Sequence, residues 1–221
     1  MGLKFHKPFS PFILETEVPR KFIDIINNSG DLVLSDKQKT AHWDWSDNLV
    51  GKVSNEIQIP ISKDKDKKYI LDVLKNGCLE YLKYAIENNR AYKWKEISKG
   101  ETPTKENINV TQSWIVSQFK GEFNPFHHHN GDLSSVIYLK IPKGMNDEWK
   151  EEFKDHYPAK GLIEFRYGEV HEWICDNMKF FPEVGKWLIF PSWLKHFVYP
   201  FDSEGERRSM SFNAEIIRIT E

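Results

Sequence analysis

The sequence lacks the features that mark a disulfide-rich or membrane-spanning protein. Its 221 residues include only two cysteines, Cys78 and Cys175, which are far apart and form no Cys-x-x-Cys pair. We therefore expect free thiols in a reducing compartment rather than a disulfide scaffold. No apolar run approaches the roughly 18 residues of a transmembrane helix, and the N-terminus lacks the apolar stretch of a signal peptide. These absences favour a cytoplasmic protein that does not contact a membrane.

A strong net charge is also lacking. The formal net charge is −2, and only six of the 31 basic residues are arginines. Because nucleic-acid binding usually needs a basic face, we do not expect a nucleic-acid partner. Aromatic residues, in contrast, make up 14% of the chain. A chain of this length and composition can bury a sizeable core, and we expect a single domain spanning residues 1–221.

The front half of the sequence, residues 1–107, is predicted to form a mixed, helix-rich region that supports the back half. Apolar residues recur at helical spacing between Lys68 and Asn89, which makes this the clearest helix of the chain. The charged run 62–68 before it is typical of a solvated face or a helix entry. The sequence also predicts a strand over 12–18 and a helix from Pro19 to about Asn28. Residues 35–60 are predicted to be loop, with one strand at most.

The back half, residues 108–217, has the residue pattern of an all-β structure. Short β-branched and aromatic runs are separated by Gly, Pro, Asn and Asp, which is typical of a sandwich or barrel. Residues 145–158 read as a helical or irregular insertion. The runs that predict strands are 114–119, 134–141, 161–167, 186–191, 196–200 and 207–217.

Three consecutive histidines, His127, His128 and His129, stand just before one of these strands. Side chains alternate along an extended chain, so His127 and His129 share one face and His128 points away. His196 follows an apolar run and a Pro-Ser break, and we expect it at the start of another strand. His127, His129 and His196 could then converge on one metal ion, and imidazole suits iron, zinc, copper or nickel.

Residues 204–216 alternate with a period of two, which puts Arg207, Ser209 and Asn213 on one face of a strand. By periodicity alone this is an ordinary half-exposed strand. Yet it begins eleven residues after His196, and a hairpin would place Arg207 and Ser209 deep in the barrel, beyond the metal. A guanidinium and a hydroxyl are suited to hold the distal carboxylate of a small dicarboxylic acid.

At this point the sequence resembles a known family. The spacing from His196 to Arg207-x-Ser209 is similar to the second half of the Fe(II)/2-oxoglutarate-dependent dioxygenase signature. Over roughly residues 108–217 the chain resembles a bacterial and phage family of 2-oxoglutarate/iron oxygenases, relatives of the prolyl hydroxylases. The segments that carry the resemblance are HHHNGDLSSVIYLKIP, GLIEF, FPSWLKHFVYP and ERRSMSFN, in this order.

The resemblance implies a double-stranded β-helix, a jelly-roll and cupin-like fold braced by the N-terminal helices. It also implies Fe(II), 2-oxoglutarate as co-substrate, and O2. His127 and His196 would then be iron ligands, and Arg207 with Ser209 would bind 2-oxoglutarate. Tyr138 could add a hydrogen bond to the co-substrate. Asn124 and Asn213 could line the substrate pocket, with ordinary packing as the alternative for each of these three residues.

The second iron ligand stays open at this stage. The usual triad is His-x-Asp/Glu…His, but here a histidine, His129, stands at the carboxylate position. The family resemblance implies a His-x-His pattern and favours His129. Asp132 is the rival, because the Asn130-Gly131 turn could fold it back towards the metal. An imidazole in place of a carboxylate leaves the iron site one unit more positive.

The sequence thus predicts an oxidoreductase that hydroxylates a protein side chain or small molecule and releases succinate and CO2. Three alternatives stay open. They are a cupin-like metal-binding module without 2-oxoglutarate chemistry, a three-histidine iron dioxygenase and a zinc hydrolase. The substrate and the oligomeric state are not encoded in any pattern that we can read, because one fold serves many substrates.

Overall fold

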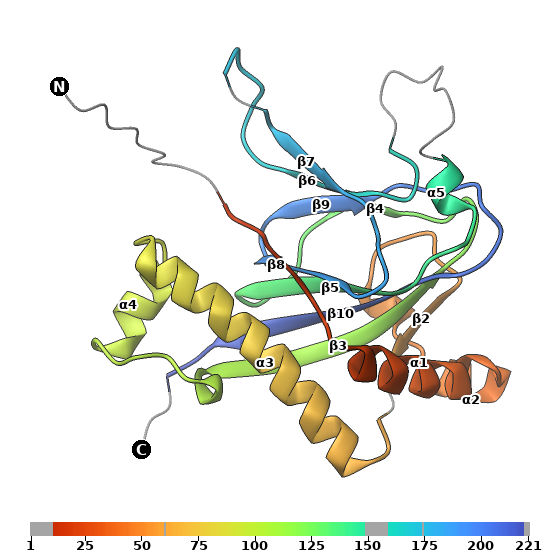
Figure 1. Cartoon of the computed structure of the whole chain (residues 1–221), viewed down its shortest axis with the longest axis horizontal. Coiled ribbons are helices and arrows are strands. Elements are labelled where there is room, and N and C mark those ends of the chain that lie inside the picture. Colours follow the sequence, from red (N-terminus) through yellow and green to blue (C-terminus); the bar gives the residue numbers. More distant parts are fainter. Residues whose placement is uncertain (1–10, 60, 149–158, 174, 219–221) are drawn as a thin grey trace.

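The chain folds into three layers, which Figure 1 shows in this computed structural model. Helices α1 (Arg20–Leu34) and α3 (Asp64–Glu87) lie against a six-stranded antiparallel sheet, and a four-stranded antiparallel sheet faces its other side. The large sheet has the order β1-β8-β5-β10-β3-β2, and the small sheet has the order β4-β9-β6-β7. The structure describes residues 11–59, 61–148, 159–173 and 175–218.

The two sheets are built mostly from the back half of the chain. The large sheet contains β1 (Leu14–Glu17), β2 (Asn55–Gln58), β3 (Ile108–Gln118), β5 (Leu133–Lys140), β8 (Lys186–Pro191) and β10 (Arg207–Ile216). The small sheet contains β4 (Asn124–His127), β6 (Ile163–Arg166), β7 (Asn177–Phe180) and β9 (Lys195–Val198). The remaining elements are α2 (Lys37–His42), α4 (Tyr92–Ser98), α5 (Met145–Glu148) and the 3-10 turns η1 (Ser46–Asn48) and η2 (Lys105–Asn107).

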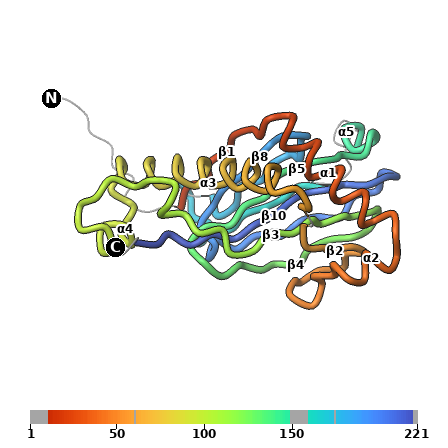
Figure 2. Tube along the Cα trace, turned by 90° about the horizontal axis from the view of Figure 1, so that it is seen from below, coloured from red at the N-terminus to blue at the C-terminus, as the bar shows by residue number. Residues whose placement is uncertain are grey.

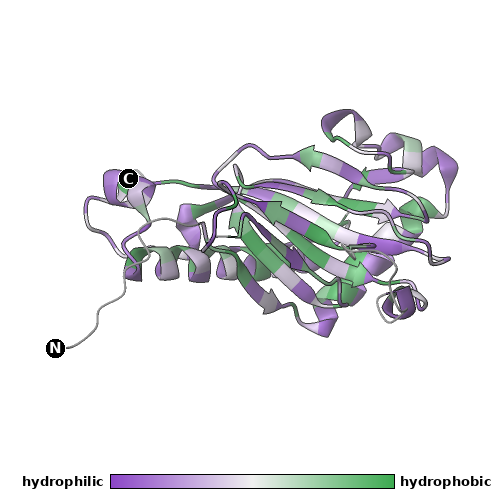
Figure 3. Cartoon of the chain, turned by 90° about the horizontal axis from the view of Figure 1, so that it is seen from above, coloured by the Kyte–Doolittle hydropathy of each residue, from purple (hydrophilic) through white to green (hydrophobic). Residues whose placement is uncertain are grey.

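The main core lies between the large sheet and helices α1 and α3. Buried residues of α3 recur one turn apart, at Ile70, Leu74 and Cys78, so that one stripe of the helix faces the sheet. Figure 2 shows α4 beyond one end of α3 and α2 towards the opposite end of the molecule. Apolar residues concentrate in the central strands, whereas the outer faces of the helices are largely polar (Figure 3). A second, smaller apolar cluster fills the space between the two sheets.

The mainly β fold class predicted from the sequence is confirmed, and most predicted strands have their counterparts. The helix predicted over 68–89 is α3, which begins four residues earlier, at Asp64, so the charged run is a helix entry. Strands β4 and β7 and helix α4 were not predicted. The predicted insertion at 145–158 begins with α5, and its residues 149–158 lie outside the described ranges.

Two predictions in the front half were wrong. Helix α1 does not end near Asn28 but continues to Leu34, and Gly30 lies on its buried face, close to the sheet. A Cβ at this glycine would stand 3.0 Å from Cδ1 of Ile115. The segment 35–60, predicted as loop with room for one strand, contains a helix as well, α2. Its N-cap is Asp36, whose carboxylate accepts hydrogen bonds from the next backbone N–H groups.

The predicted hairpin between the strands at 196–200 and 207–217 was also wrong. β9 pairs with β4 and β6, whereas β10 pairs with β3 and β5, so the two strands belong to facing sheets. Residues 199–206 carry the chain from one sheet to the other. This crossover still places β10 opposite the residues of β9, across the space between the sheets.

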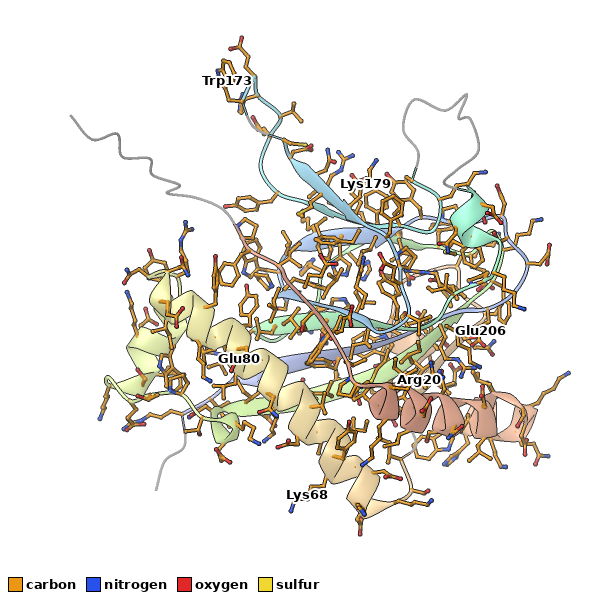
Figure 4. All side chains as sticks on the ribbon, viewed as in Figure 1. Arg20, Lys68, Glu80, Trp173, Lys179 and Glu206 are labelled. Atoms are coloured by element: carbon orange, nitrogen blue, oxygen red, sulfur yellow. The ribbon has the colours of Figure 1, made fainter. Side chains whose placement is uncertain are left out.

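Two further features concern the surface. Trp173 stands at the tip of the β6–β7 connection, away from both sheets (Figure 4), and its side chain is 93% exposed. Within the described ranges, no helix combines the length and the apolar character that crossing a membrane requires. Both Cys78 and Cys175 are free thiols.

The close approach of α3 to β8 gives a first prediction. A Cβ at Gly77 would stand 2.1 Å from the Trp187 indole, so Gly77→Ala should lower the free energy of unfolding by about 2 kcal/mol despite the better helix propensity of alanine. The exposed neighbour Asn76→Ala serves as the control and should change it by less than about 0.5 kcal/mol. Urea denaturation measures both values, and equal stability of Gly77→Ala and wild type would contradict this packing.

Candidate metal centre and its cavity

Three histidines meet at the inner face of the small sheet. His127, the last residue of β4, lies directly opposite His196 of β9 in the antiparallel register, and side chains at such paired positions lie on the same face. His129 follows two residues later. Its backbone N–H donates to the carbonyl of Ser192 at 2.9 Å, and the N–H of Ser192 donates to the carbonyl of Asp132 at 3.0 Å. These bonds join the turn after β4 to the turn before β9.

The three rings are close enough to share one ion. Their centroids are 4.4 Å apart for His127 and His196, 4.9 Å for His127 and His129, and 5.2 Å for His129 and His196. One ring nitrogen from each lies within 4.8 Å of the others. Nitrogens this close together suit a single metal ion, whose usual distance to a ligating nitrogen is about 2.1 Å.

Hydrogen bonds to the backbone set the orientation of two of these rings. Nδ1 of His127 lies 2.6 Å from the carbonyl oxygen of Pro125, and Nδ1 of His196 lies 2.9 Å from that of Leu194. A carbonyl only accepts, so in each pair Nδ1 carries the hydrogen and donates it. The lone pair of Nε2 is then free for a metal, which is the usual arrangement around ligating histidines.

Burial keeps these imidazoles neutral. It lowers the pKa of His127, against the opposing effect of the Pro125 carbonyl. It lowers the pKa of His129 to about 3, with a further contribution from His127 and His128, and lowers that of His196 well below its usual 6.5. Neutral imidazole is the form that binds a metal, so no proton has to leave at neutral pH.

Two other polar residues of this turn, His128 and Asp132, lie outside the cluster. His128 is exposed, on the opposite side of the chain from its neighbours, as the alternation predicts. Asp132 accepts hydrogen bonds from Lys93 and, at 2.7 Å, from the backbone N–H of Ile216. Its carboxylate therefore fastens the end of β10, and His129 rather than Asp132 joins His127 and His196.

A cavity between the two sheets connects the histidines to Arg207 and Ser209 of β10. Arg207 is 1% exposed. Its Nη1 donates to the side-chain oxygen of Gln118, and its Nε has no hydrogen-bond partner. Among the described residues no carboxylate forms an ion pair with it. Burial lowers the pKa of Arg207, and a buried guanidinium without a counter-charge is costly, so the cavity offers a place for an anion.

The other predicted pocket residues lie in three different environments. Asn124 lines the cavity, where its amide oxygen accepts from Gln118 at 3.1 Å. Tyr138 is fully buried, with its ring centroid 5.1 Å from the Arg207 guanidinium carbon and its hydroxyl without a hydrogen-bond partner. Asn213 shares the face of Arg207 but does not line the cavity, and its amide donates to Gln112 at 3.2 Å.

The front half contributes cavity residues that the sequence analysis missed. Leu49, Val50 and Glu56 line the cavity together with Gln118 from β3. The segment NEIQI does alternate, with Glu56 and Gln58 on one face and Ile57 and Ile59 on the other. That pattern was available in the sequence, but so short a strand gives no indication of which sheet it joins.

A comparison with models of known protein families gave a match. Residues 112–213 match the sequence model of the family described as "Putative 2OG-Fe(II) oxygenase". This segment contains the three histidines, Arg207 and Ser209. It begins and ends close to the bounds of the resemblance inferred above, which is thereby confirmed. A comparison with curated proteins gave no match.

Several solved structures have a similar fold. A prolyl hydroxylase from Trichoplax adhaerens, in complex with a hypoxia inducible factor peptide fragment, is 14% identical over 93% of this chain and 83% of its own, with a TM-score of 0.52. AviO1 from Streptomyces viridochromogenes Tue57 is 11% identical over 92% and 89%, with a TM-score of 0.55.

A third is SnoK, a non-heme alpha ketoglutarate dependent carbocyclase from nogalamycin biosynthesis. It is 10% identical over 91% of this chain and 78% of its own, with a TM-score of 0.56. At these identities the likeness establishes the fold, while the family match rests on the sequence itself. The match of residues 112–213 to the model of the putative 2OG-Fe(II) oxygenase family indicates that this protein is an oxidoreductase that uses Fe(II) and 2-oxoglutarate.

Proposed function

We propose that His127, His129 and His196 hold Fe(II), and that Arg207 with Ser209 binds the distal carboxylate of 2-oxoglutarate in the same cavity. The observation that carries the proposal is the buried guanidinium of Arg207, which faces a cavity shared with three neutral imidazoles and has no acidic partner. A dicarboxylate that reaches from the metal to Arg207 would supply the missing counter-charge.

The residues present fit both groups. Neutral imidazoles are suitable iron ligands, and the unpartnered Nε of Arg207 leaves a donor for a carboxylate. When bound, Fe(II) and 2-oxoglutarate supply the oxidising chemistry, in which O2 is consumed and succinate and CO2 are released. The protein then orients the co-substrate through Arg207, and the aromatic rings of Phe165 and Phe190 around His196 keep water from that side of the centre.

We propose further that the reaction is hydroxylation of a protein side chain or a small molecule within a single-domain chain. In this division residues 108–217 form the catalytic jelly roll and residues 1–107 support it. The three-histidine set also suits an iron dioxygenase that needs no 2-oxoglutarate. That second candidate does not explain the unpaired charge of Arg207. A titration with 2-oxoglutarate distinguishes the two candidate functions.

Arg207 and Arg208 form a matched pair for this test, because their side chains lie on opposite faces of β10. Arg208 binds Glu206 and Asp31 on the helix side. Arg207→Gln should weaken 2-oxoglutarate binding about 100-fold, because it removes one partner of a buried charge pair. Arg208→Gln should leave the affinity unchanged. The measurement is an anaerobic titration of the Fe(II) protein, followed by the visible charge-transfer band of the chelate.

A second co-substrate provides the control for this titration. 2-Oxobutyrate keeps the chelating keto acid but lacks the distal carboxylate, so its affinity should not respond to Arg207→Gln. If wild type binds Fe(II) and gives no band with 2-oxoglutarate, the second candidate, an iron dioxygenase that needs no 2-oxoglutarate, replaces this proposal. If both keto acids bind equally well to all three proteins, Arg207 has no part in binding.

Three substitutions in one turn test the ligand set. His129→Ala should lower Fe(II) affinity by more than about 100-fold, since even the loss of an outer partner costs about 10- to 100-fold. Asp132→Asn should keep the affinity but lower the free energy of unfolding by about 1–2 kcal/mol, because it weakens the bonds to Lys93 and Ile216. His128→Ala should change neither. Metal titration and urea denaturation provide the readouts, and normal iron binding by His129→Ala would contradict the assignment.

A further inference from the structure

One carboxylate in the cavity has no evident structural role. Glu56 lies on β2 directly opposite Val116 of β3, which is in turn opposite Ser209 of β10. Side chains at such paired positions share one face, and here this face lines the cavity. Neighbouring strands are about 4.8 Å apart, so the backbones of Glu56 and Ser209 are separated by roughly 10 Å. Glu56 therefore faces the cavity beyond the proposed co-substrate site.

The side chain of Glu56 is buried without a counter-charge. The residue is 4% exposed, and its Oε1 has no hydrogen-bond partner. In the described part of the chain no lysine, arginine or histidine forms an ion pair with it. It is also not a member of the histidine cluster, which holds His127, His129 and His196 alone. Arg207 is directed to the neutral Gln118 instead.

The surroundings add negative charge. Burial raises the pKa of Glu56 from 4.5 to about 7, the Asn124 amide opposes this shift, and the carboxylates of Asp44 and Glu122 raise the pKa further. A buried acceptor that is left unsatisfied lowers stability. Local conflicts of this kind are expected where a residue serves function rather than the fold.

We propose that Glu56 is a specificity-determining residue that binds a cationic group, an alkylammonium or guanidinium, on the substrate. The inference rests on the proposed function, because it takes the other end of the cavity to be filled by the carboxylate of 2-oxoglutarate at Arg207. The two ends then differ in charge. A cation in the cavity beside Glu56 satisfies the unpartnered oxygen, offsets the desolvation of the carboxylate and is favoured by the nearby negative charges of Asp44 and Glu122.

The binding test uses a pair of probes that differ in charge alone. n-Butylammonium and 1-butanol are titrated by calorimetry into the anaerobic protein loaded with Fe(II) and 2-oxoglutarate. Wild type should bind the ammonium ion at least about tenfold more tightly than the alcohol, since a charged hydrogen bond exceeds a neutral one. Glu56→Gln should abolish that preference and leave the affinity for the alcohol and the visible band of the chelate unchanged.

Glu122→Gln is the matched control. Its carboxylate accepts from Ser54 and, at 2.9 Å, from the backbone N–H of Phe119, and it does not line the cavity. This variant removes a nearby negative charge without changing the cavity wall, so it should keep most of the preference for the ammonium ion. Equal binding of the two probes by wild type overturns the inference, and so does an unchanged preference in Glu56→Gln.

The same titration in metal-free protein separates this inference from the proposed function. If the visible band fails to form but the ammonium preference is present and lost in Glu56→Gln, the assignment of Fe(II) and 2-oxoglutarate fails while the cation site stands. If the band forms and no preference exists in either state of the protein, the proposed function stands and the cation site is overturned.

Urea denaturation at pH 5 and pH 8 tests whether the Glu56 carboxylate stabilises the folded state. A carboxyl whose pKa is raised on folding stays protonated in the native state between pH 4.5 and about 7, so the stability that it contributes is lost as pH rises through that window. The amide of Glu56→Gln does not ionise. The denaturation midpoint of Glu56→Gln should exceed that of wild type, and the difference should be larger at pH 8 than at pH 5. A lower midpoint at both pH values would make the carboxylate structural and overturn the proposal.

Discussion

The guanidinium of Arg207 is buried on the inner face of β10 with a neutral amide as its hydrogen-bond partner, and the arrangement of the site follows from that constraint. A buried charge without a counter-charge is unfavourable, so an anion in the cavity would stabilise the fold. Gln118, Asn124 and the carbonyl of Val50 form a chain of hydrogen bonds that begins at this guanidinium. These bonds link the proposed anion site of the back half to the front-half loop around Val50, which lines the cavity.

The second requirement is the pairing of β4 with β9 and of the two adjoining turns, which brings the three histidines of the proposed metal site together. β4 and β9 bring His127 and His196 together by direct pairing, and the backbone bonds between the two adjoining turns add His129. Asp132 strengthens the same region from outside, since its carboxylate binds the end of β10. A carboxylate close to the histidines in sequence thus serves the fold, while Glu56, a distant one, faces the cavity.

Much of the site was readable from the sequence because its chemistry lies in short regular patterns. The alternation in extended chain assigned His127 and His129 to one face and His128 to the other, and the period of two in β10 grouped Arg207 with Ser209. The choice between His129 and Asp132 was not readable, because it depends on how two turns hydrogen-bond to each other. The facing sheets were mistaken for a hairpin for a related reason: a short connection between strands does not reveal whether they pair. The contribution of β2 was missed because four residues carry too little periodicity to assign a partner strand.

A crystal structure of the protein grown anaerobically with Fe(II) and 2-oxoglutarate tests the central claim most directly. Anomalous scattering at the iron edge locates the metal, and the difference density locates the co-substrate. The account predicts a single iron atom bonded to His127, His129 and His196, with the distal carboxylate of 2-oxoglutarate on the Arg207 guanidinium. Iron bound by Asp132, or a co-substrate carboxylate that does not contact Arg207, would contradict it.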